Sequence, residues 1–393
     1  MTRRMAIDDL WAWEHLLTEE EKSARDSVRQ WVRERFMPVI QEAHRHGQFP
    51  KHLVGEMAEL GVFGASLEGY GCAGMTPVAY GLVLQELERG DSGLRSMCSV
   101  QGSLVMYPIY AFGDESQRER WLPGLASGQL VGCFGLTEPN AGSDPAAMKT
   151  TAELDGDAYI LNGIKCWITN SPIADLAIIW AKVKNEDDRI RGFVVERGTE
   201  GFSTPDIEGK FSLRASETGE IHLNDCRIPK SHLLPETGGL KYPLGCLTQA
   251  RFGISFGATG AAIDCFETVL EYGQERIAFN KPIASFQLYQ DKLAEMATKI
   301  VNSQLLSLHY GRLKERGELT PAHVSVAKRH NVRAAREIAI EARSMLGGIG
   351  ITDAYSVMRH LMNIESVYTY EGTHEVHTLA IGRALTGINA FAG

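Results

Sequence analysis

The sequence predicts a mainly helical α+β protein in three parts: helices, then an antiparallel β barrel or sandwich, then long helices that form a bundle. The first observation is that the spacing of apolar residues changes near residue 131 from a period of about 3.6 to a period of about 2. The second is the return of the helical period after Leu240. The third is that no amphipathic run of helix length separates the predicted strands, which argues against a βαβ fold. We therefore expect domains at residues 1–130, 131–240 and 241–393.

The first predicted helix begins at a capping box, in which Thr18 and Glu21 satisfy backbone N–H groups of the first turn. Apolar residues follow at helical spacing until Pro38, which we expect to stop the helix. A short second helix opens at Pro50 and closes at Gly61, because glycine readily takes the left-handed conformation that ends a helix.

Two further helices of the first domain have clear start signals. Thr76 and Pro77 begin a helix that is so apolar over residues 78–84 that it must be mostly buried. Asp114 caps the other helix, which we expect to end near Pro123.

The middle of the chain reads as strands with turn residues between them. Alternating or continuous apolar runs that contain Ile, Val, Phe and Trp are typical of strands. The predicted strands are residues 159–165, 176–183, 191–196 and 220–223.

The last third of the chain predicts long helices that pack as a bundle. The first of them carries Gly253, Gly257 and Gly260, small residues that let helices approach closely. The predicted helices are residues 251–272, 287–313, 320–345 and 373–385.

The composition excludes several classes of protein. A net charge of −9 without a block of Lys or Arg argues against a nucleic-acid partner. No apolar run approaches the roughly 20 residues that a membrane helix needs, and Met1–Asp9 lacks the apolar region of a signal peptide. Seven cysteines without a Cys-x-x-Cys pair are typical of reduced thiols. We expect a cytoplasmic protein without stable membrane insertion.

Glu371 lies in a run, residues 368–375, that is otherwise mostly apolar, aromatic or hydroxylic. A carboxylate that is kept from water there has a raised pKa and can abstract a proton near neutral pH. Gly372 has no Cβ and lets a flat ligand approach. The same residues also fit a surface acid at a helix start that Thr373 caps. The local sequence leaves both interpretations open.

Two segments beside the first strands are rich in Gly, Pro, hydroxyl and amide groups: residues 134–145 and 167–171. Their backbone N–H groups and hydroxyls are donors that a flat heteroaromatic ring or a phosphate needs. Each segment also fits an ordinary loop, in the second case around a packed Trp167.

Arg95 and Ser96 form a candidate site for a carboxylate, since a guanidinium binds one through two parallel hydrogen bonds. The alternative is that Arg95 makes a structural ion pair with Glu88 or Asp91.

Two other sequence patterns give weaker evidence for a functional site. Gly347–Gly350 follows a predicted helix rather than a strand, which favours a helix end over a dinucleotide-binding turn. His374 and His377 lack the i, i+4 spacing of the protease zinc helix, and we expect no metal site.

Four segments in order resemble the acyl-CoA dehydrogenase family: Leu136–Asp144, Trp167–Asn170, Arg276–Gln287 and Tyr370–Thr373. The resemblance runs nearly from end to end. Residues 88–96, 209–216 and 383–388 are most similar to the glutaryl-CoA dehydrogenases of that family.

The resemblance implies FAD, an acyl-CoA substrate, a four-helix C-terminal domain, a homotetramer, and electron-transferring flavoprotein as the electron acceptor. It implies that Glu371 is the catalytic base that removes the α-proton. The implied substrate-binding residues are Arg95, Ser96, Glu88, Ser143, Arg251, Tyr370 and Gly372. The implied cofactor-binding residues are Phe134, Leu136, Thr137, Gly142, Ser143, Trp167, Ile168, Thr169, Arg276, Phe279, Gln287, Gly347, Gly348, Thr373 and Glu375. Of these, Arg276, Gln287, Gly347 and Gly348 are implied to reach the flavin across a subunit boundary.

The expected reaction is oxidation of glutaryl-CoA and decarboxylation to crotonyl-CoA. A non-decarboxylating short-chain dehydrogenase, an acyl-CoA oxidase on the same fold, and a non-catalytic CoA- or flavin-binding homologue remain alternatives. The chain departs from the family at Asn280, where Gly is usual, and at Ile349, where Asn is usual. Both lie in segments implied to bind the flavin adenosine.

Overall fold

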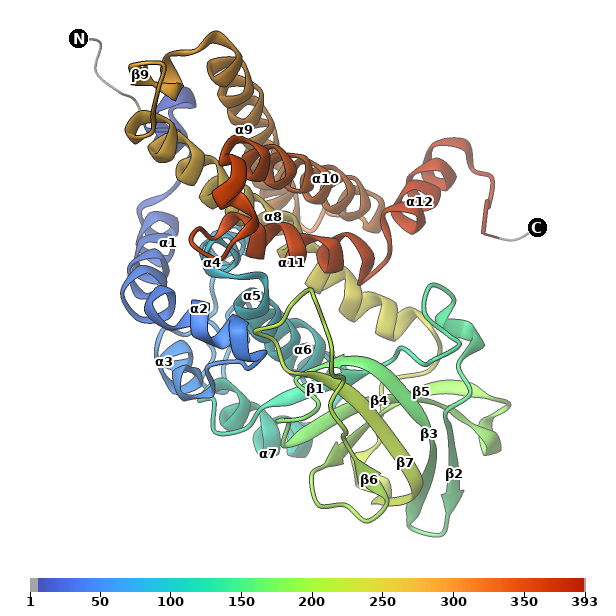
Figure 1. The fold of residues 1–393 in the computed structure, drawn as a ribbon. Helices are drawn as coiled ribbons and strands as arrows, with labels where there is room; N and C mark the ends of the chain where they lie inside the picture. The colour runs from blue at the N-terminus through green and yellow to red at the C-terminus, as the bar shows by residue number, and fades with distance from the viewer. Residues whose placement is uncertain (1–5, 392–393) are drawn as a thin grey trace.

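The computed structural model describes residues 6–391 and has helices at both ends of the chain with a sheet between them (Figure 1). The mainly helical α+β class is therefore confirmed. Met1 to Met5, the first part of the N-terminal segment considered above, lie outside the described residues, as do the last two residues of the predicted third domain.

The N-terminal helices surround a core of apolar side chains that also reaches the first strands. They are α1 (Glu19–Trp31), α2 (Met37–His46), α3 (Val54–Glu59), α4 (Pro77–Gly90), α5 (Ser92–Ser99), α6 (Tyr107–Phe112) and α7 (Glu115–Ala126).

The capping boxes at Thr18 and Asp114 are present, and Gly61 is left-handed with φ +68°. The prediction that Pro38 stops the first helix was wrong. A π-helical segment, Val32–Phe36, joins α1 to α2 and places Pro38 in the first turn of α2, where an N–H is not needed. Helix α7 likewise continues beyond Pro123, to Ala126.

The middle sheet has the strand order β1-β4-β2-β3-β7-β6, with β5 paired to β4. The strands are β1 (Gly132–Gly135), β2 (Thr151–Asp155), β3 (Ala158–Thr169), β4 (Leu176–Val183), β5 (Arg189–Glu196), β6 (Phe202–Ser203) and β7 (Thr218–Pro229). A wholly antiparallel sheet was wrong in one respect, because β1 and β2 both run parallel to β4. The sheet is mixed because β3, rather than a helix, makes the return crossing between β2 and β4.

The C-terminal part contains the long helix α8, which crosses the molecule from the β domain to the far end of the bundle (Figure 1). Its elements are α8 (Lys241–Glu275), β8 (Ile277–Ala278), β9 (Lys281–Pro282), α9 (Gln287–Glu315), α10 (Pro321–Met345), α11 (Val357–Thr369) and α12 (His374–Thr386). The end of α12 projects from the bundle (Figure 1).

The close helix approach predicted from the glycines of α8 is present, and the partner is α4. A Cβ on Gly253 would lie 2.4 Å from Leu84 Cδ1, and one on Gly260 would lie 1.9 Å from the carbonyl oxygen of Gln85. Since no side chain fits at such distances, the two helices approach as closely as these glycines allow. This contact joins the N-terminal helices to the bundle.

Helix α11 is anchored to the junction of α4 and α5. Arg359 donates to Asp91 Oδ2 over 2.6 Å and to the carbonyl oxygen of Gly90 over 2.7 Å, and Asn363 donates to the same carboxylate over 2.8 Å. The Oδ1 atom of Asn363 accepts the backbone N–H of Leu213 from the middle domain over 2.8 Å. The N-terminal part and the middle part of the chain therefore both fix α11, and with it the segment that follows.

Among residues 6–391, no helix is long and apolar enough to cross a membrane. The seven cysteines are free thiols, six of them buried.

Candidate active site

The segment Tyr370–Thr373 links α11 to α12 in an uncommon backbone conformation. Glu371 has φ +51° and Gly372 has φ +89°, so two consecutive residues are left-handed. Such a conformation costs a glutamate on the order of 1 kcal/mol or more and persists only where the surroundings impose it. A Cβ on Gly372 would lie 2.9 Å from His377 Nε2, which explains the glycine. Thr373 accepts the N–H of Val376 over 3.2 Å, so the helix cap read from the sequence is also present.

The carboxylate of Glu371 is shielded from water. The residue is half-buried, and its Oε2 atom is closed off without a hydrogen-bond partner in the described part of the chain. Burial raises the pKa of Glu371, and the positive charges of Arg95, Lys328 and Arg251 oppose that rise. An unpartnered carboxylate with a raised pKa has the properties of a general base.

Two cations, the half-buried Arg251 and the buried Lys328, hold the main chain around this carboxylate. Arg251 Nε, on α8, donates to the carbonyl oxygen of Glu371 over 2.6 Å. Lys328 Nζ, on α10, donates to the carbonyl oxygen of Gly372 over 2.6 Å and also to that of Tyr370. The three consecutive carbonyl groups thus face cations, whereas the N–H of Glu371 makes no hydrogen bond to any of residues 6–391.

Sequence reasoning missed Lys328 and gave Arg251 only a role toward substrate. The one signal for Lys328 was its position four residues after Val324 and four residues before Val332, which places it on an apolar face of the predicted helix. Its side chain is 2% exposed, and burial lowers its pKa below the usual range, while the charge of Glu371 opposes that shift.

The structure brings Arg95 to the loop of Glu371, although 275 positions separate Arg95 from Tyr370. Arg95 Nε donates to Glu88 Oε2 over 2.7 Å, Nη2 donates to the Tyr370 hydroxyl, and Ser96 Oγ lies 3.5 Å from that hydroxyl. The structural ion pair that the sequence left open therefore exists, and it holds the guanidinium beside the candidate base. Arg95 Nη1 has no partner within residues 6–391.

The pair between Arg95 and Glu88 is built into the helix packing. A Cβ on Gly257 of α8 would lie 2.1 Å from Glu88 Oε2 and 3.2 Å from Arg95 Nε. Although burial by itself disfavours the charged guanidinium, the Glu88 carboxylate raises the pKa of Arg95 above its usual range. Arg95 is therefore a fixed, permanent cation in a nearly dry site.

The two segments beside the strands lie at one rim of the sheet. Trp167, near the end of β3, is 64% exposed with φ +59°, so the packed tryptophan considered above was wrong. The hydroxyls of Thr137, Ser143 and Thr169 make no hydrogen bond to the described residues, and a Cβ on Gly142 would meet open space. An exposed indole beside free hydroxyls fits a flat ring with polar edges.

A buried ion pair shapes the first of these segments. Lys165 Nζ donates to Glu138 Oε1 over 2.8 Å and to the carbonyl oxygen of Leu136 over 3.1 Å. Glu138 also accepts the N–H of Thr150 over 2.9 Å. The segment is therefore held rigidly beside the first strands.

Three of the expected cofactor contacts have side chains in the cores. Phe134, Leu136 and Ile168 are 7%, 5% and 3% exposed, and they pack with other apolar residues. Any contact they make with a ligand would come from their main chain.

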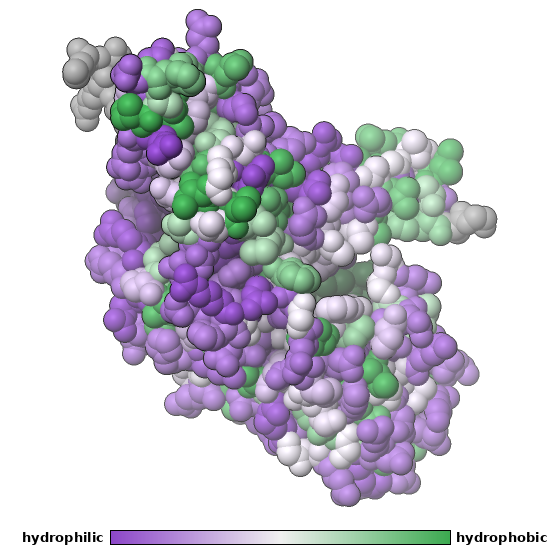
Figure 2. All heavy atoms as spheres, in the orientation of Figure 1, coloured by the Kyte–Doolittle hydropathy of each residue, from purple (hydrophilic) through white to green (hydrophobic). Residues whose placement is uncertain are grey.

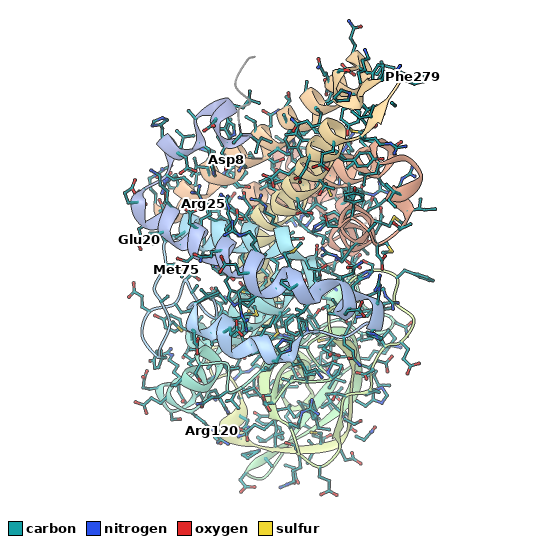
Figure 3. The ribbon with its side chains drawn as sticks, turned by 60° about the vertical axis from the view of Figure 1, so that its left-hand side comes forward. Asp8, Glu20, Arg25, Met75, Arg120 and Phe279 are labelled. Atoms are coloured by element: carbon teal, nitrogen blue, oxygen red, sulfur yellow. The ribbon has the colours of Figure 1, made fainter. Side chains whose placement is uncertain are left out.

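Another group of expected cofactor contacts lies beyond the C-terminal ends of α8 and α10. About 25 residues of helix separate Arg251 from Arg276, which at about 1.5 Å per residue is roughly 38 Å. Phe279, 89% exposed, stands at the tip of the β8–β9 hairpin (Figure 3), and Gln287, Gly347 and Gly348 are exposed as well. One copy of the chain does not bring this group to Glu371. Asn280, the departure from the family, has φ +62°, a conformation that asparagine tolerates well.

The surface is hollowed between α12 and the β domain, with apolar residues at its base (Figure 2). Thr373 lies at the start of α12, and Glu375 in its first turn is exposed. No group of three or more His, Cys, Asp or Glu side chains among residues 6–391 is placed to hold a metal ion.

The chain matches three family models in succession. They are the acyl-CoA dehydrogenase N-terminal domain at residues 18–129, the middle domain at residues 133–226 and the C-terminal domain at residues 237–386. It is 34% identical to an acyl-CoA dehydrogenase of Bacillus subtilis, over 94% of this chain and 99% of that protein.

Two solved structures of glutaryl-CoA dehydrogenase from Mycobacterium smegmatis are similar to it over 99% of this chain and 100% of theirs. One is 53% identical with a TM-score of 0.96. The other, a complex with FADH2, is 49% identical with a TM-score of 0.97.

Proposed function

Because the chain belongs to the acyl-CoA dehydrogenase family and is an FAD-dependent enzyme of that family, we propose that it oxidises glutaryl-CoA and decarboxylates the product to crotonyl-CoA. The observation that supports glutaryl-CoA as the substrate is that the buried Arg95 lies beside the loop of Glu371 and that its Nη1 is free. The similarity to glutaryl-CoA dehydrogenase of M. smegmatis supports the same substrate.

Glu371 removes the α-proton of the thioester. The C–H bond is acidic only when the thioester carbonyl is polarised, and the unbonded N–H of Glu371 is the donor that this chain supplies. FAD, when bound, would supply the acceptor for the hydride equivalent that leaves the β-carbon. The peptide plane that carries this N–H also contains the carbonyl oxygen of Tyr370, which Lys328 holds, so the N–H keeps one direction and no reorganisation is needed when charge develops.

Arg95 binds the distal carboxylate of the acyl chain. Nη1 is the free donor, while Nε and Nη2 are fixed by Glu88 and Tyr370. The distal carboxyl carbon of a glutaryl group lies only three bonds from the α-carbon. Arg95 contacts Tyr370, the residue next to the base, and its guanidinium is therefore suitably placed to bind this carboxylate.

Decarboxylation follows from the same residues. Once the α,β double bond has formed, loss of CO2 leaves an electron pair that is delocalised onto the thioester carbonyl. Protonated Glu371 is the acid that returns the proton to the γ-carbon, which gives crotonyl-CoA and restores the base.

The flavin would be held by the rim of the sheet and by a second copy of the chain. Trp167, Thr137 and Thr169 fit the ring system, as described above. We propose that Arg276, Phe279, Gln287, Gly347 and Gly348 bind the flavin of a partner subunit in a homotetramer. Their distance from Glu371 along α8 supports this. Electron-transferring flavoprotein is the proposed acceptor, and the free cysteines support a reducing, cytoplasmic location.

The proposal predicts the outcome of an anaerobic titration with a panel of acyl-CoA thioesters. Glutaryl-CoA should bleach the flavin absorbance and release CO2, measured by headspace analysis, at lower concentrations than butyryl-CoA does. Bleaching without CO2 would favour a non-decarboxylating dehydrogenase. Rapid peroxide formation in air would favour an oxidase, and a colourless protein a non-catalytic homologue.

Trp167→Ala should weaken FAD binding by about tenfold to a hundredfold, because the variant loses the face on which the ring system packs. FAD affinity of the apoprotein, measured by the quenching of flavin fluorescence, tests this. Ile164→Ala is the matched control, since Ile164 is an exposed apolar side chain (44%) on the same strand. Equal affinities in the two variants would contradict the role of Trp167.

A further inference from the structure

Lys328 is buried and has two main-chain partners, one on either side of Glu371. Its ammonium group donates to the carbonyl oxygens of Tyr370 and Gly372 and lies 5.8 Å from the centre of the Tyr370 ring. It does not donate to the Glu371 carboxylate. A buried lysine is costly unless its donors are used, and here they are used on the main chain of the candidate base.

This arrangement accounts for the left-handed conformation of Glu371. Glu371 and Gly372 have φ of +51° and +89°, and the three successive carbonyl groups of Tyr370, Glu371 and Gly372 all accept from side-chain cations. Lys328 binds the first and third of these groups, and Arg251 binds the second. If the carbonyls of Tyr370 and Gly372 lost their donor, the segment would relax toward a less strained conformation.

We propose that Lys328 is a positioning residue for the base: it holds the Tyr370–Gly372 backbone so that the Glu371 carboxylate is correctly aimed, and its positive charge favours the ionised form of that carboxylate. The inference rests on the proposed role of Glu371. Lys328 touches neither substrate nor flavin in this account and acts through the loop.

The direction of the electrostatic effect follows from the neighbours of Lys328. The titratable and charged groups that face it are Glu371 and Tyr370 on the loop, Arg251 on α8, Arg95 on α5, and His374 and His377 on α12. Glu371 is the acid among them. Burial raises the pKa of Glu371, and the positive charge of Lys328 lowers it. Removing that charge therefore raises the pKa of Glu371 and moves the acid limb of the activity profile to higher pH.

The test is the pH dependence of turnover in the holoenzyme with Lys328→Met. The acid limb of kcat should move up by about one pH unit or more, as expected for loss of a nearby opposite charge. At its optimum, kcat should fall by about tenfold to a hundredfold with little change in KM, because the base is misaimed. Lys328→Arg retains charge and donors and should keep the acid limb of the wild type. Lys328→Gln, which is polar and neutral, replaces the Met variant if that variant does not retain FAD.

Lys210→Met is the matched control. Lys210 is also a desolvated lysine, with its pKa lowered to about 8 by burial, and it donates to the carbonyl oxygens of Leu213 and Ser216 around left-handed Leu213. It lies in the middle domain, so its loss should lower the melting temperature and leave the acid limb unmoved. An unmoved acid limb in FAD-loaded Lys328→Met would overturn the inference. Full activity of Glu371→Gln would instead overturn the base itself, so the two failures are distinct.

Discussion

Replacing Glu371 with Gln should abolish turnover while FAD stays bound. The amide keeps the size of the side chain and cannot accept the α-proton, so kcat should fall by at least about 10³-fold, within the range that a general base contributes. Anaerobic addition of glutaryl-CoA should no longer bleach the flavin, and exchange of the α-proton with solvent deuterium, followed by NMR, should stop. Removing a buried carboxylate that has no hydrogen-bond partner for Oε2 should not lower the melting temperature.

Glu365→Gln provides the comparison. Glu365 is an exposed carboxylate on α11 that pairs with Arg336 over 2.6 Å. Glu365 has the same carboxylate side chain as Glu371 and lies six positions before it, but it is not shielded from water. Its replacement should leave the α-proton exchange at the wild-type rate. Exchange persisting in Glu371→Gln would place the base elsewhere.

Replacing Arg95 should change substrate preference more than it changes chemistry. For Arg95→Met, kcat/KM for glutaryl-CoA should fall by about 10²–10³-fold, the usual result of removing one member of a buried charge pair. The value for butyryl-CoA, which has no distal carboxylate, should fall far less. The ratio of the two kcat/KM values is the measurement.

Stability complicates this variant, because Glu88 would be left as a buried charge without Arg95, which costs about 3–5 kcal/mol. The double variant Arg95→Met with Glu88→Gln removes both charges and should recover stability but not glutaryl-CoA preference. Arg359→Met is the matched control, since Arg359 makes a buried pair with Asp91 away from the acyl chain. It should lower the melting temperature and leave the ratio unchanged. A drop in the ratio there, or equal losses on both substrates in the Arg95 variants, would count against the carboxylate site.

Local structure was predictable where local physics decides it. The caps at Thr18 and Asp114 and the close helix approach at the glycines of α8 depend on neighbours in sequence or on side-chain size alone, and all are present. The predictions failed where the backbone between two elements departs from its regular form or direction. Pro38 is tolerated because a π-helical segment absorbs it, and β2 runs parallel to β4 because β3 returns the chain between them.

The sequence by itself determined the fold class and the candidate base, because both depend on residues that are close together in the chain. The spacing of apolar residues indicates the fold class, and the segment around Glu371 indicates the base. It did not decide whether Glu371 is a surface acid or a shielded one. Only the tertiary structure did, by closing off Oε2 and placing Arg95, Arg251 and Lys328 from three separate helices around the loop. The reason is physical: the pKa of a carboxylate depends on burial and on charges within a few ångströms, and those charges are 43 to 276 positions away in the chain.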